Sequence, residues 1–393
     1  MIQGVEVSWD RTAELFSLDP SVYHLNHGSF GAVPIPVQRA QQRLRDEMDA
    51  NPMAFFTRGL TDRLAHTRRH LAAFLGADSE GTALVPNATA AITIVLGSLG
   101  LVAGDEILVT NHGYGTVPMA AQRLGLRVTE AGFGLTADDD EIVAAIIARV
   151  RPGRTKLAVV DQITSPTARL LPVARIAAAL RERGVALMVD GAHVPGTLNV
   201  DVSSIDADFW LGNLHKWAFA PRPTAVLVVR PEHRAGIQPL AVSWEQANGF
   251  PDSVEFGGTL DYTGWLAAPT GIHLLRTLGP DRVRRHNSDL AEYGRRVVTE
   301  AIGTEPVPAG PAIVTGMRLV RLPDSVPDQA AASQLRQRVA TELGCEIAAN
   351  FWSGHAYLRL SAQVYNRAEH YDRLAAGLPG VLARARSAGR PTA

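Results

Sequence analysis

Two charged residues stand in apolar stretches of the chain, where a charge is expensive. Asp190 ends the run VALMVD, and Lys216 lies between His215 and Trp217 in GNLHKWAFAP. A buried carboxylate needs a cationic or hydrogen-bonding partner, so Asp190 alone fits a helix cap or an ion pair as well as a catalytic role. A lysine in apolar surroundings is more readily neutral, and a neutral amine attacks aldehydes. Together the two residues suit a site that binds an aldehyde cofactor as a Schiff base and pairs its ring nitrogen with an acid.

The basic residues narrow the choice of a Schiff-base former. Of the 38 lysines and arginines, only Lys156 and Lys216 are lysines. Arginine cannot take this role because its guanidinium group stays protonated. Lys156 lies in the polar stretch RPGRTK, as a solvent-exposed lysine would. We therefore predict that Lys216 carries the covalent link.

A third segment has the composition of an anion site. LVPNATAAITIVLG (84–97) is expected to be a loop that opens a helix, with Asn87 as its cap. The N–H groups of Ala88 and Thr89, with the Thr89 hydroxyl, can then bind a phosphate. Many helices begin with Asn or Thr, so the segment alone is weak evidence for a phosphate site. The hypothesis is strengthened because the segment precedes Asp190 and Lys216 in the same chain.

Alternating apolar strands and amphipathic helices must position these residues. Strands are expected at 106–110, 126–131, 156–162, 185–190, 208–212 and 224–230, and helices at 114–124, 138–151 and 172–183. This order predicts an α/β fold with a mostly parallel sheet, whose sites lie at the carboxyl ends of the strands. After residue 263 the pattern becomes that of a smaller α+β domain. We expect a large domain at 24–262 and a small domain formed by 1–23 and 263–393.

The composition excludes several classes of protein. The chain is 46% hydrophobic and 20% charged with a net charge of −1, which favours a soluble globular protein without a nucleic-acid or membrane surface. No apolar run reaches the roughly 18 residues of a membrane span, and the N-terminal segment lacks a signal-peptide pattern, so a cytoplasmic location is expected. The single cysteine, Cys345, excludes an internal disulfide and a cysteine-cluster metal site, and no metal is expected.

Three motifs resemble one family. They are Asp-x-x-His at Asp190 and His193, His-Lys-Trp at 215–217, and Gly-Thr-x-Asp at 258–261. They are similar to the class V aminotransferase superfamily of pyridoxal 5′-phosphate (PLP) enzymes, fold type I, and to its isopenicillin N epimerase-like branch. LNHGSFGAVP, NPMAFFTR, TSPTARLLP and FGGTLDYTGWLAAP also resemble that branch. The resemblance covers residues 23 to 375 and implies PLP as cofactor, with a seven-stranded, mostly parallel sheet in the large domain.

The resemblance also implies roles for residues around the cofactor. Lys216 would bind PLP covalently and then shuttle protons, and Asp190 would pair with the ring nitrogen. His193 and Ser165 would lie near the ring hydroxyl. Tyr114 or His112 would cover the ring face, with Tyr114 preferred. The phosphate would be held by Ala88, Thr89, Asn213, His215 and, from a second subunit, Thr259. A homodimer with its site at the subunit interface is therefore expected.

The same resemblance implies a set of residues for the amino-acid substrate. Arg359 would clamp the substrate carboxylate through a bidentate pair. Without the resemblance, Arg359 would read as an ordinary exposed strand arginine. Four further residues would line the substrate entrance: Asn26, His27, Phe56 and Arg58.

Three reactions remain open for such a site. We favour β-elimination on a cysteine S-conjugate, a C–S lyase reaction of specialised metabolism similar to those of ergothioneine and lincosamide (antibiotic) biosynthesis, with Tyr114 as proton donor. Amino-acid epimerisation is the first alternative, and decarboxylation-coupled deamination is the second. A lyase-inactive binding module is a remote one, because Lys216 and Asp190 are both present. Cysteine desulfuration is disfavoured, since Cys345 in ELGCEIAAN is expected to be a buried thiol.

Overall fold

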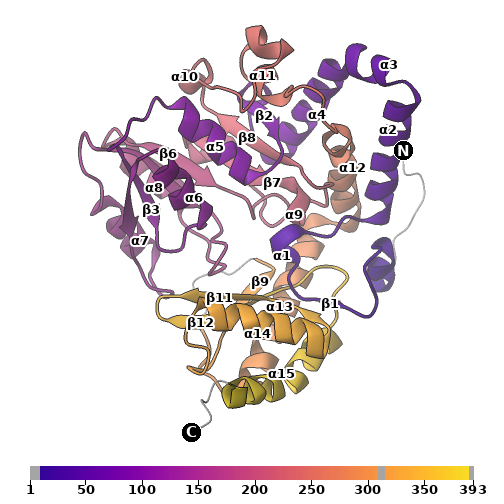
Figure 1. The fold of residues 1–393 in the computed structure, drawn as a ribbon, viewed down its shortest axis with the longest axis vertical. Helices are drawn as coiled ribbons and strands as arrows, with labels where there is room; N and C mark the ends of the chain where they lie inside the picture. Colours follow the sequence, from indigo (N-terminus) through magenta and orange to yellow (C-terminus); the bar gives the residue numbers. More distant parts are fainter. Residues whose placement is uncertain (1–8, 309–314, 389–393) are drawn as a thin grey trace. The chain divides into compact units, whose positions relative to one another are not determined.

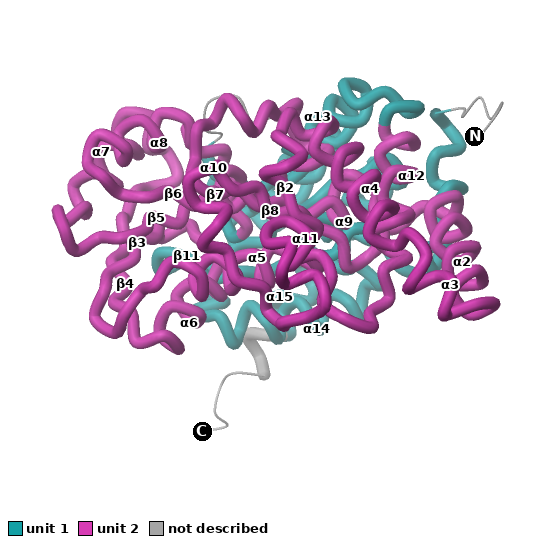
Figure 2. The backbone as a smooth tube through the Cα atoms, turned by 90° about the horizontal axis from the view of Figure 1, so that it is seen from above, with its two compact units in different colours: residues 1–32, 166–168, 276–393 teal, residues 33–165, 169–275 magenta. Residues whose placement is uncertain are grey.

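The computed structural model describes residues 9–308 and 315–388. The described chain divides into two compact units, which Figure 2 colours separately. The large unit comprises residues 33–165 and 169–275. The small unit comprises the described residues up to 32, residues 166–168, and those from 276 onward. The domain limits predicted from the sequence, 24–262 against the rest, stay a prediction.

A seven-stranded sheet forms the centre of the large unit (Figure 1). Its spatial order is β2-β8-β7-β6-β5-β3-β4. The strands are β2 (Thr82–Val85), β3 (Glu106–Thr110), β4 (Arg127–Ala131), β5 (Thr155–Asp161), β6 (Ala186–Asp190), β7 (Phe209–Asn213) and β8 (Ala225–Val229). All neighbours are parallel except β8, which runs antiparallel to β2 and β7. The predicted α/β fold with a mostly parallel sheet is confirmed.

Helices cover this sheet because both of its faces are apolar. Every residue of β3 and β7 is buried, as expected for strands covered on both sides. The helices of the large unit are α2 (Ile35–Ala50), α3 (Pro52–Thr57), α4 (Leu60–Leu75), α5 (Ala88–Ser98), α6 (Thr116–Arg123), α7 (Asp139–Ile147), α8 (Val173–Arg181), α9 (Leu214–Trp217), α10 (Pro231–Arg234), α11 (Asp252–Glu255) and most of α12 (Thr263–Leu278). Helices α5 and α6 share one apolar core with β3, β5 and β7, and α8 packs on β6.

The seventh strand, β2, lies where the sequence indicated only a loop. It has four residues and pairs with β8 alone, so it is too short for its periodicity to be recognised. A buried ion pair secures it: Arg68 on α4 lies 2.6 Å from Glu255, and the other oxygen of Glu255 accepts the Leu84 N–H at 2.8 Å. The strand sets the starting point of α5, the helix with the predicted anion site.

The small unit has a three-stranded antiparallel sheet in the order β11-β12-β9. Its elements are β1 (Tyr23–His24), α1 (His27–Phe30), α13 (Pro280–Ile302), β9 (Met317–Arg321), α14 (Gln329–Leu343), β10 (Cys345–Glu346), β11 (Ala348–Trp352), β12 (His355–Ser361) and α15 (Ala368–Ala388). Helices α13, α14 and α15 enclose one apolar core with the sheet. Among the described residues of the whole chain, no helix combines the length and the apolar character that crossing a membrane requires.

Candidate functional site

Two carboxylates meet at the carboxyl edge of the large sheet. Asp161 ends β5 and Asp190 ends β6, and the two residues are direct partners in the parallel register. Each is 3% exposed. The next strand in the sheet, β7, leads directly into α9, which carries Lys216. The topology therefore brings Asp190 and Lys216 to the edge at which parallel sheets place their sites.

Burial makes this carboxylate pair reluctant to ionise. Burial and the neighbouring Asp190 carboxylate raise the pKa of Asp161 well above its ordinary range, against the backbone N–H groups of Ser165 and Tyr114 and the charge of Lys216. Burial also raises the pKa of Asp190, with the Ala192 N–H and Lys216 acting in the opposite sense. A cation beside this pair stabilises the ionised form and lowers these pKa values, as the charge of Lys216 does.

The two oxygens of Asp190 differ in their hydrogen bonding. Oδ1 accepts the N–H of Ala192 at 2.9 Å. Among the described residues, Oδ2 has no hydrogen-bond partner, whereas both oxygens of Asp161 accept backbone N–H groups. A protonated ring nitrogen supplies the single charged N–H donor that Oδ2 lacks. The donor set therefore fits the ring of PLP.

Lys216 faces an imidazole. Its Nζ lies 3.1 Å from Nε2 of His193, and Nδ1 of the same ring lies 3.3 Å from the indole nitrogen of Trp217. His193 is 1% exposed and Trp217 is 2% exposed. Lys156, in contrast, is exposed and donates to the carbonyl of Gly153. This contrast supports Lys216 as the chemically distinct lysine.

The first turn of α5 supplies a donor close to β7. Asn87 caps the helix as predicted, since its side chain accepts the Ala90 N–H at 2.9 Å. The N–H of Ala88 differs from the expectation that it is free, because it donates to Oδ1 of Asn213 at 2.9 Å. Among the described groups, the N–H of exposed Thr89 has no such partner. The roles of Ala88, Thr89 and Asn213 toward a phosphate stay predictions.

The two candidates for the ring face differ in their surroundings. His112 is fully buried, stacks on Phe133 with centroids 4.4 Å apart, and has Nε2 3.1 Å from the Phe133 carbonyl oxygen. Burial lowers the pKa of His112 to about 4. Tyr114 is 39% exposed, and Asp161 accepts its backbone N–H at 3.3 Å. His112 is therefore buried against Phe133 with a lowered pKa, while the Tyr114 side chain remains accessible, and which of the two covers the ring face stays a prediction.

The remaining predicted cofactor residues lie in loops or on α9. The partly buried Ser165 follows β5 and donates its N–H to Asp161 at 3.4 Å. His215 lies on α9, with Nδ1 2.9 Å from the Thr224 carbonyl oxygen, and burial lowers its pKa to about 4. Thr259 is exposed in the loop before α12. Their contacts with a cofactor stay predictions.

Three of the predicted substrate residues lie in the small unit. Arg359 on β12 is 3% exposed, so it is not the ordinary surface arginine that the sequence alone allowed. Its guanidinium group donates to Asn26 at 3.2 Å and to Ser29 at 3.1 Å. His27 is also buried, with Nδ1 3.0 Å from the Tyr365 hydroxyl. The structure thus brings Asn26 and Arg359 together and places His27 in packing contacts.

The other two predicted substrate residues lie at α3 in the large unit. Phe56 is partly buried and makes an edge contact with Tyr262, with ring centroids 6.3 Å apart. Arg58 is exposed and follows the last residue of α3. Their roles at a substrate entrance stay predictions.

Two residues of the site were missed by reasoning from the sequence. Asp161 ends the apolar strand KLAVVD in the same way that Asp190 ends VALMVD, so the signal was present. Trp217 was considered only as an apolar neighbour of Lys216 and as part of the His-Lys-Trp motif, with no role of its own. Its contact with His193 depends on the turn between β7 and α9, which the sequence pattern does not reveal.

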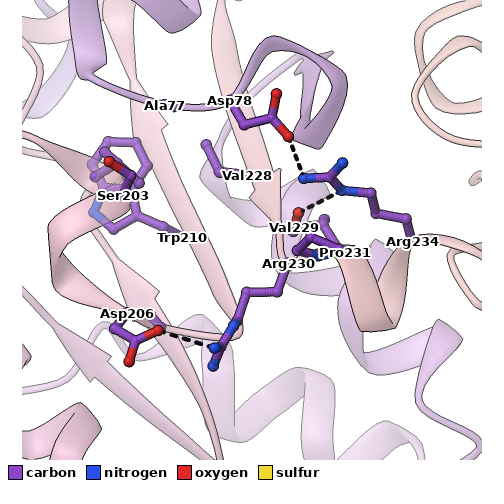
Figure 3. Close-up of a pocket in the computed structure, with 12 residues that line it drawn as sticks. Ala77, Asp78, Ser203, Asp206, Trp210, Val228, Val229, Arg230, Pro231 and Arg234 are labelled. Carbon is purple, nitrogen blue, oxygen red and sulfur yellow. Dashed lines mark hydrogen bonds and ion pairs between the residues drawn. The ribbon is translucent and has the colours of Figure 1, made fainter.

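A separate cavity of about 210 Å³ lies away from this edge. Its lining includes Val229, the last residue of β8, and Val229 pairs with Phe209, the first residue of β7. The cavity therefore lies at the amino edge of the parallel strands, opposite to the edge that carries Asp190. Figure 3 shows two ion pairs in its lining, Arg230 with Asp206 and Arg234 with Asp78. The described residues contain no group of three or more His, Cys, Asp or Glu side chains that could bind a metal ion.

Comparisons with known proteins agree with the fold. Residues 31–374 match the family model described as aminotransferase class-V. The chain is 33% identical to an isopenicillin N epimerase of Streptomyces clavuligerus, over 94% of this chain and 97% of that protein. It is 28% identical to an L-cysteine desulfhydrase of Arabidopsis thaliana, over 95% and 90% of the two chains.

A solved structure supports the same fold. The cystine C–S lyase C-DES in complex with its reaction product, cysteine persulfide, superposes with a TM-score of 0.76 at 20% identity, over 91% of this chain and 97% of that one. The family model covers most of the chain, including both strand-end aspartates and the lysine that follows β7. On these grounds the chain belongs to the class V aminotransferase family of enzymes.

Proposed function

We propose that this protein is a PLP-dependent lyase that breaks the C–S bond of a cysteine S-conjugate by β-elimination. The observation that carries the cofactor assignment is the placement of Asp190 and Lys216 at one sheet edge, with Oδ2 of Asp190 open to a charged N–H donor. The solved C–S lyase complex with the same fold and the class V family membership support this assignment.

Each residue of the site has a defined task under this proposal. The cofactor, when bound, withdraws electrons from the substrate and so acidifies its Cα–H bond. Lys216 holds the cofactor and then moves the Cα proton, and Asp190 keeps the ring nitrogen protonated. Thr89 binds the phosphate through its N–H and hydroxyl at the N-terminus of α5. Arg359 binds the substrate carboxylate.

The environment of His112 favours Tyr114 as the residue over the ring face. Epimerisation needs acid–base groups on both faces of Cα, and His112 was one of the two candidates for the second face. Burial lowers the pKa of His112 to about 4, and its ring stacks on Phe133. Tyr114 remains, and a phenol hydroxyl suits proton donation to a departing thiolate. We therefore assign Tyr114 as that donor and as the residue over the ring face.

Cys345 argues against cysteine desulfuration, which requires an accessible thiolate. It lies on β10, fully buried, and burial raises the pKa of its thiol to about 11. A protonated, buried thiol does not act as a nucleophile. Elimination needs no protein thiol.

Epimerisation is the second candidate function. The observation that favours it is the 33% identity to an isopenicillin N epimerase over nearly the full length of both chains. The epimerase would use Lys216 on one face of Cα and Tyr114 on the other. Decarboxylation-coupled deamination is a third outcome of the same chemistry.

One incubation separates these reactions. The holoenzyme is incubated in D₂O with S-methyl-L-cysteine and, in parallel, with further S-conjugates. Pyruvate together with a free thiol is the expected result. Intact substrate with deuterium at Cα would instead assign the enzyme as an epimerase, and release of CO₂ would assign the decarboxylating route. The Lys216→Ala variant is the blank for all three measurements.

We propose further that the enzyme is a homodimer, with Thr259 of each subunit completing the other subunit's phosphate site. Thr259 is exposed in the single chain, as this role requires. The segment 240–244 exposes three large apolar side chains, with Leu240 at 57%, Val242 at 81% and Trp244 at 92%. Such a run of exposed apolar side chains is typical of a protein–protein contact.

Replacing Trp244 with aspartate is expected to convert the dimer into a monomer and to weaken PLP binding. The reason is that a charge buried at an apolar interface costs several kcal/mol. Sedimentation velocity measures the oligomeric state and a visible titration measures cofactor affinity. Val102→Asp is the control, since Val102 is also exposed, at 63%. A monomeric wild type, or a Trp244→Asp variant that remains dimeric, contradicts the proposal.

A further inference from the structure

His193 lies between a tryptophan and the candidate lysine. Its Nδ1 is 3.3 Å from the indole nitrogen of Trp217, and its Nε2 is 3.1 Å from Nζ of Lys216. His193 and Trp217 are almost completely buried. The two ring nitrogens therefore face different partners.

The hydrogen atoms of this triad can be assigned from their chemistry. An indole N–H can only donate, so Nδ1 of His193 must accept and carries no hydrogen. A neutral imidazole has one N–H, which then lies on Nε2 and points to Lys216. An ammonium group has no acceptor, so this contact is a hydrogen bond only when Lys216 is a neutral amine with a free lone pair. An imidazolium ring is excluded, because it would present a hydrogen to the Trp217 N–H.

We propose that Trp217 fixes the tautomer of His193, and that His193 in turn holds Lys216 as the neutral amine that attacks the cofactor aldehyde. This inference rests on the proposed PLP function. In the attack, Nζ forms a C=N bond with the aldehyde carbon, and one water leaves with the aldehyde oxygen and both amine hydrogens. Trp217 touches no reacting atom and is a positioning residue.

Other charged groups near Lys216 act in both directions. The Asp161 and Asp190 carboxylates interact with it from β5 and β6 and favour the ammonium form. His215, its neighbour on α9, is neutral because burial lowers its pKa to about 4. The His193 N–H opposes the two carboxylates. Without the Trp217 N–H, His193 is free to adopt the other tautomer, whose Nε2 accepts from an ammonium group and so favours the charged lysine.

The two-lysine composition allows a direct test on the protein without cofactor. The apoprotein is labelled with trace acetic anhydride over a pH series, and mass spectrometry gives the labelling of Lys216 relative to exposed Lys156. The labelling of each lysine rises with pH, and the midpoint of that rise is the quantity compared. Replacing Trp217 with phenylalanine is expected to raise this labelling midpoint for Lys216 by about one pH unit, the effect of losing one hydrogen bond. The midpoint of Lys156 should not move.

Trp210→Phe is the matched control. It also removes a buried indole N–H, one that donates to Gln162 at 3.0 Å, and it should leave the Lys216 midpoint unchanged. An unchanged midpoint in a folded Trp217→Phe protein overturns the proposal, as does an equal shift in Trp210→Phe.

A second measurement uses the wild-type chain, so it does not depend on the stability of a variant. ¹⁵N NMR of the histidine side chains should show His193 with a pyrrole-type Nε2 and a pyridine-type Nδ1, and the opposite assignment overturns the proposal. Neither experiment contains PLP. Both therefore decide the role of Trp217 independently of the incubation with S-conjugates that tests the proposed function.

Discussion

Replacing Lys216 with alanine is expected to abolish covalent cofactor binding and to lower kcat by at least about 10²–10⁴-fold, the usual contribution of a positioned proton-transfer group. A loss of kcat at the upper end of this range is expected because the Lys216 side chain also anchors the cofactor. Absorbance of the purified protein with added PLP, and turnover of an S-alkyl cysteine, are the measurements.

The chain offers a matched control for this variant. Lys156→Ala removes the only other lysine, which is exposed and contacts only the Gly153 carbonyl among the described hydrogen bonds. It should retain colour and activity. A Lys216→Ala protein that still turns yellow with PLP and still releases thiol would contradict the account.

The second large effect is expected at Asp190. Asparagine has nearly the same shape but cannot stabilise a protonated ring nitrogen by charge. Asp190→Asn should lower kcat by about 10²–10³-fold, as removal of one preorganised electrostatic group does. Wild-type kcat in the variant would show that the open oxygen of Asp190 does not face the ring nitrogen.

The stability of the Asp190→Asn apoprotein gives an independent readout. Burial raises the folded-state pKa values of Asp161 and Asp190 above the unfolded value of about 3.9. Their contribution to stability is therefore fully present below that pH and is lost as the pH rises through the folded-state values. The variant lacks one of these carboxyls, so it should lose less stability than the wild type over the range from about pH 4 upward. Urea unfolding of both apoproteins across this range measures the difference.

The regular part of the fold was predictable because its signal is local. The predicted strand 106–110 has the bounds of β3, and the predicted strand 185–190 differs from β6 by one residue. Continuous apolar runs of five or six residues between helical patterns leave few alternatives. β2 was not predictable, since its four residues are defined by pairing with β8, which lies some 140 residues further along the chain.

The site was predictable in its chemistry and less so in its contacts. Asp190 and Lys216 stood out because charge in an apolar run is costly. Asp161 carries the same signal, yet its importance depends on strand register, which places it beside Asp190. The engagement of the Ala88 N–H by Asn213 depends on how two loops meet. Burial of Arg359 depends on a sheet that the sequence pattern indicates without showing which side of β12 is covered.

The most direct test of the central claim is to find which lysine holds the cofactor. The protein is incubated with PLP, reduced with borohydride to make the link permanent, digested, and mapped by mass spectrometry. The account predicts a single phosphopyridoxyl adduct on Lys216, with Lys156 unmodified. An adduct confined to Lys156, or no adduct on either lysine, would contradict it.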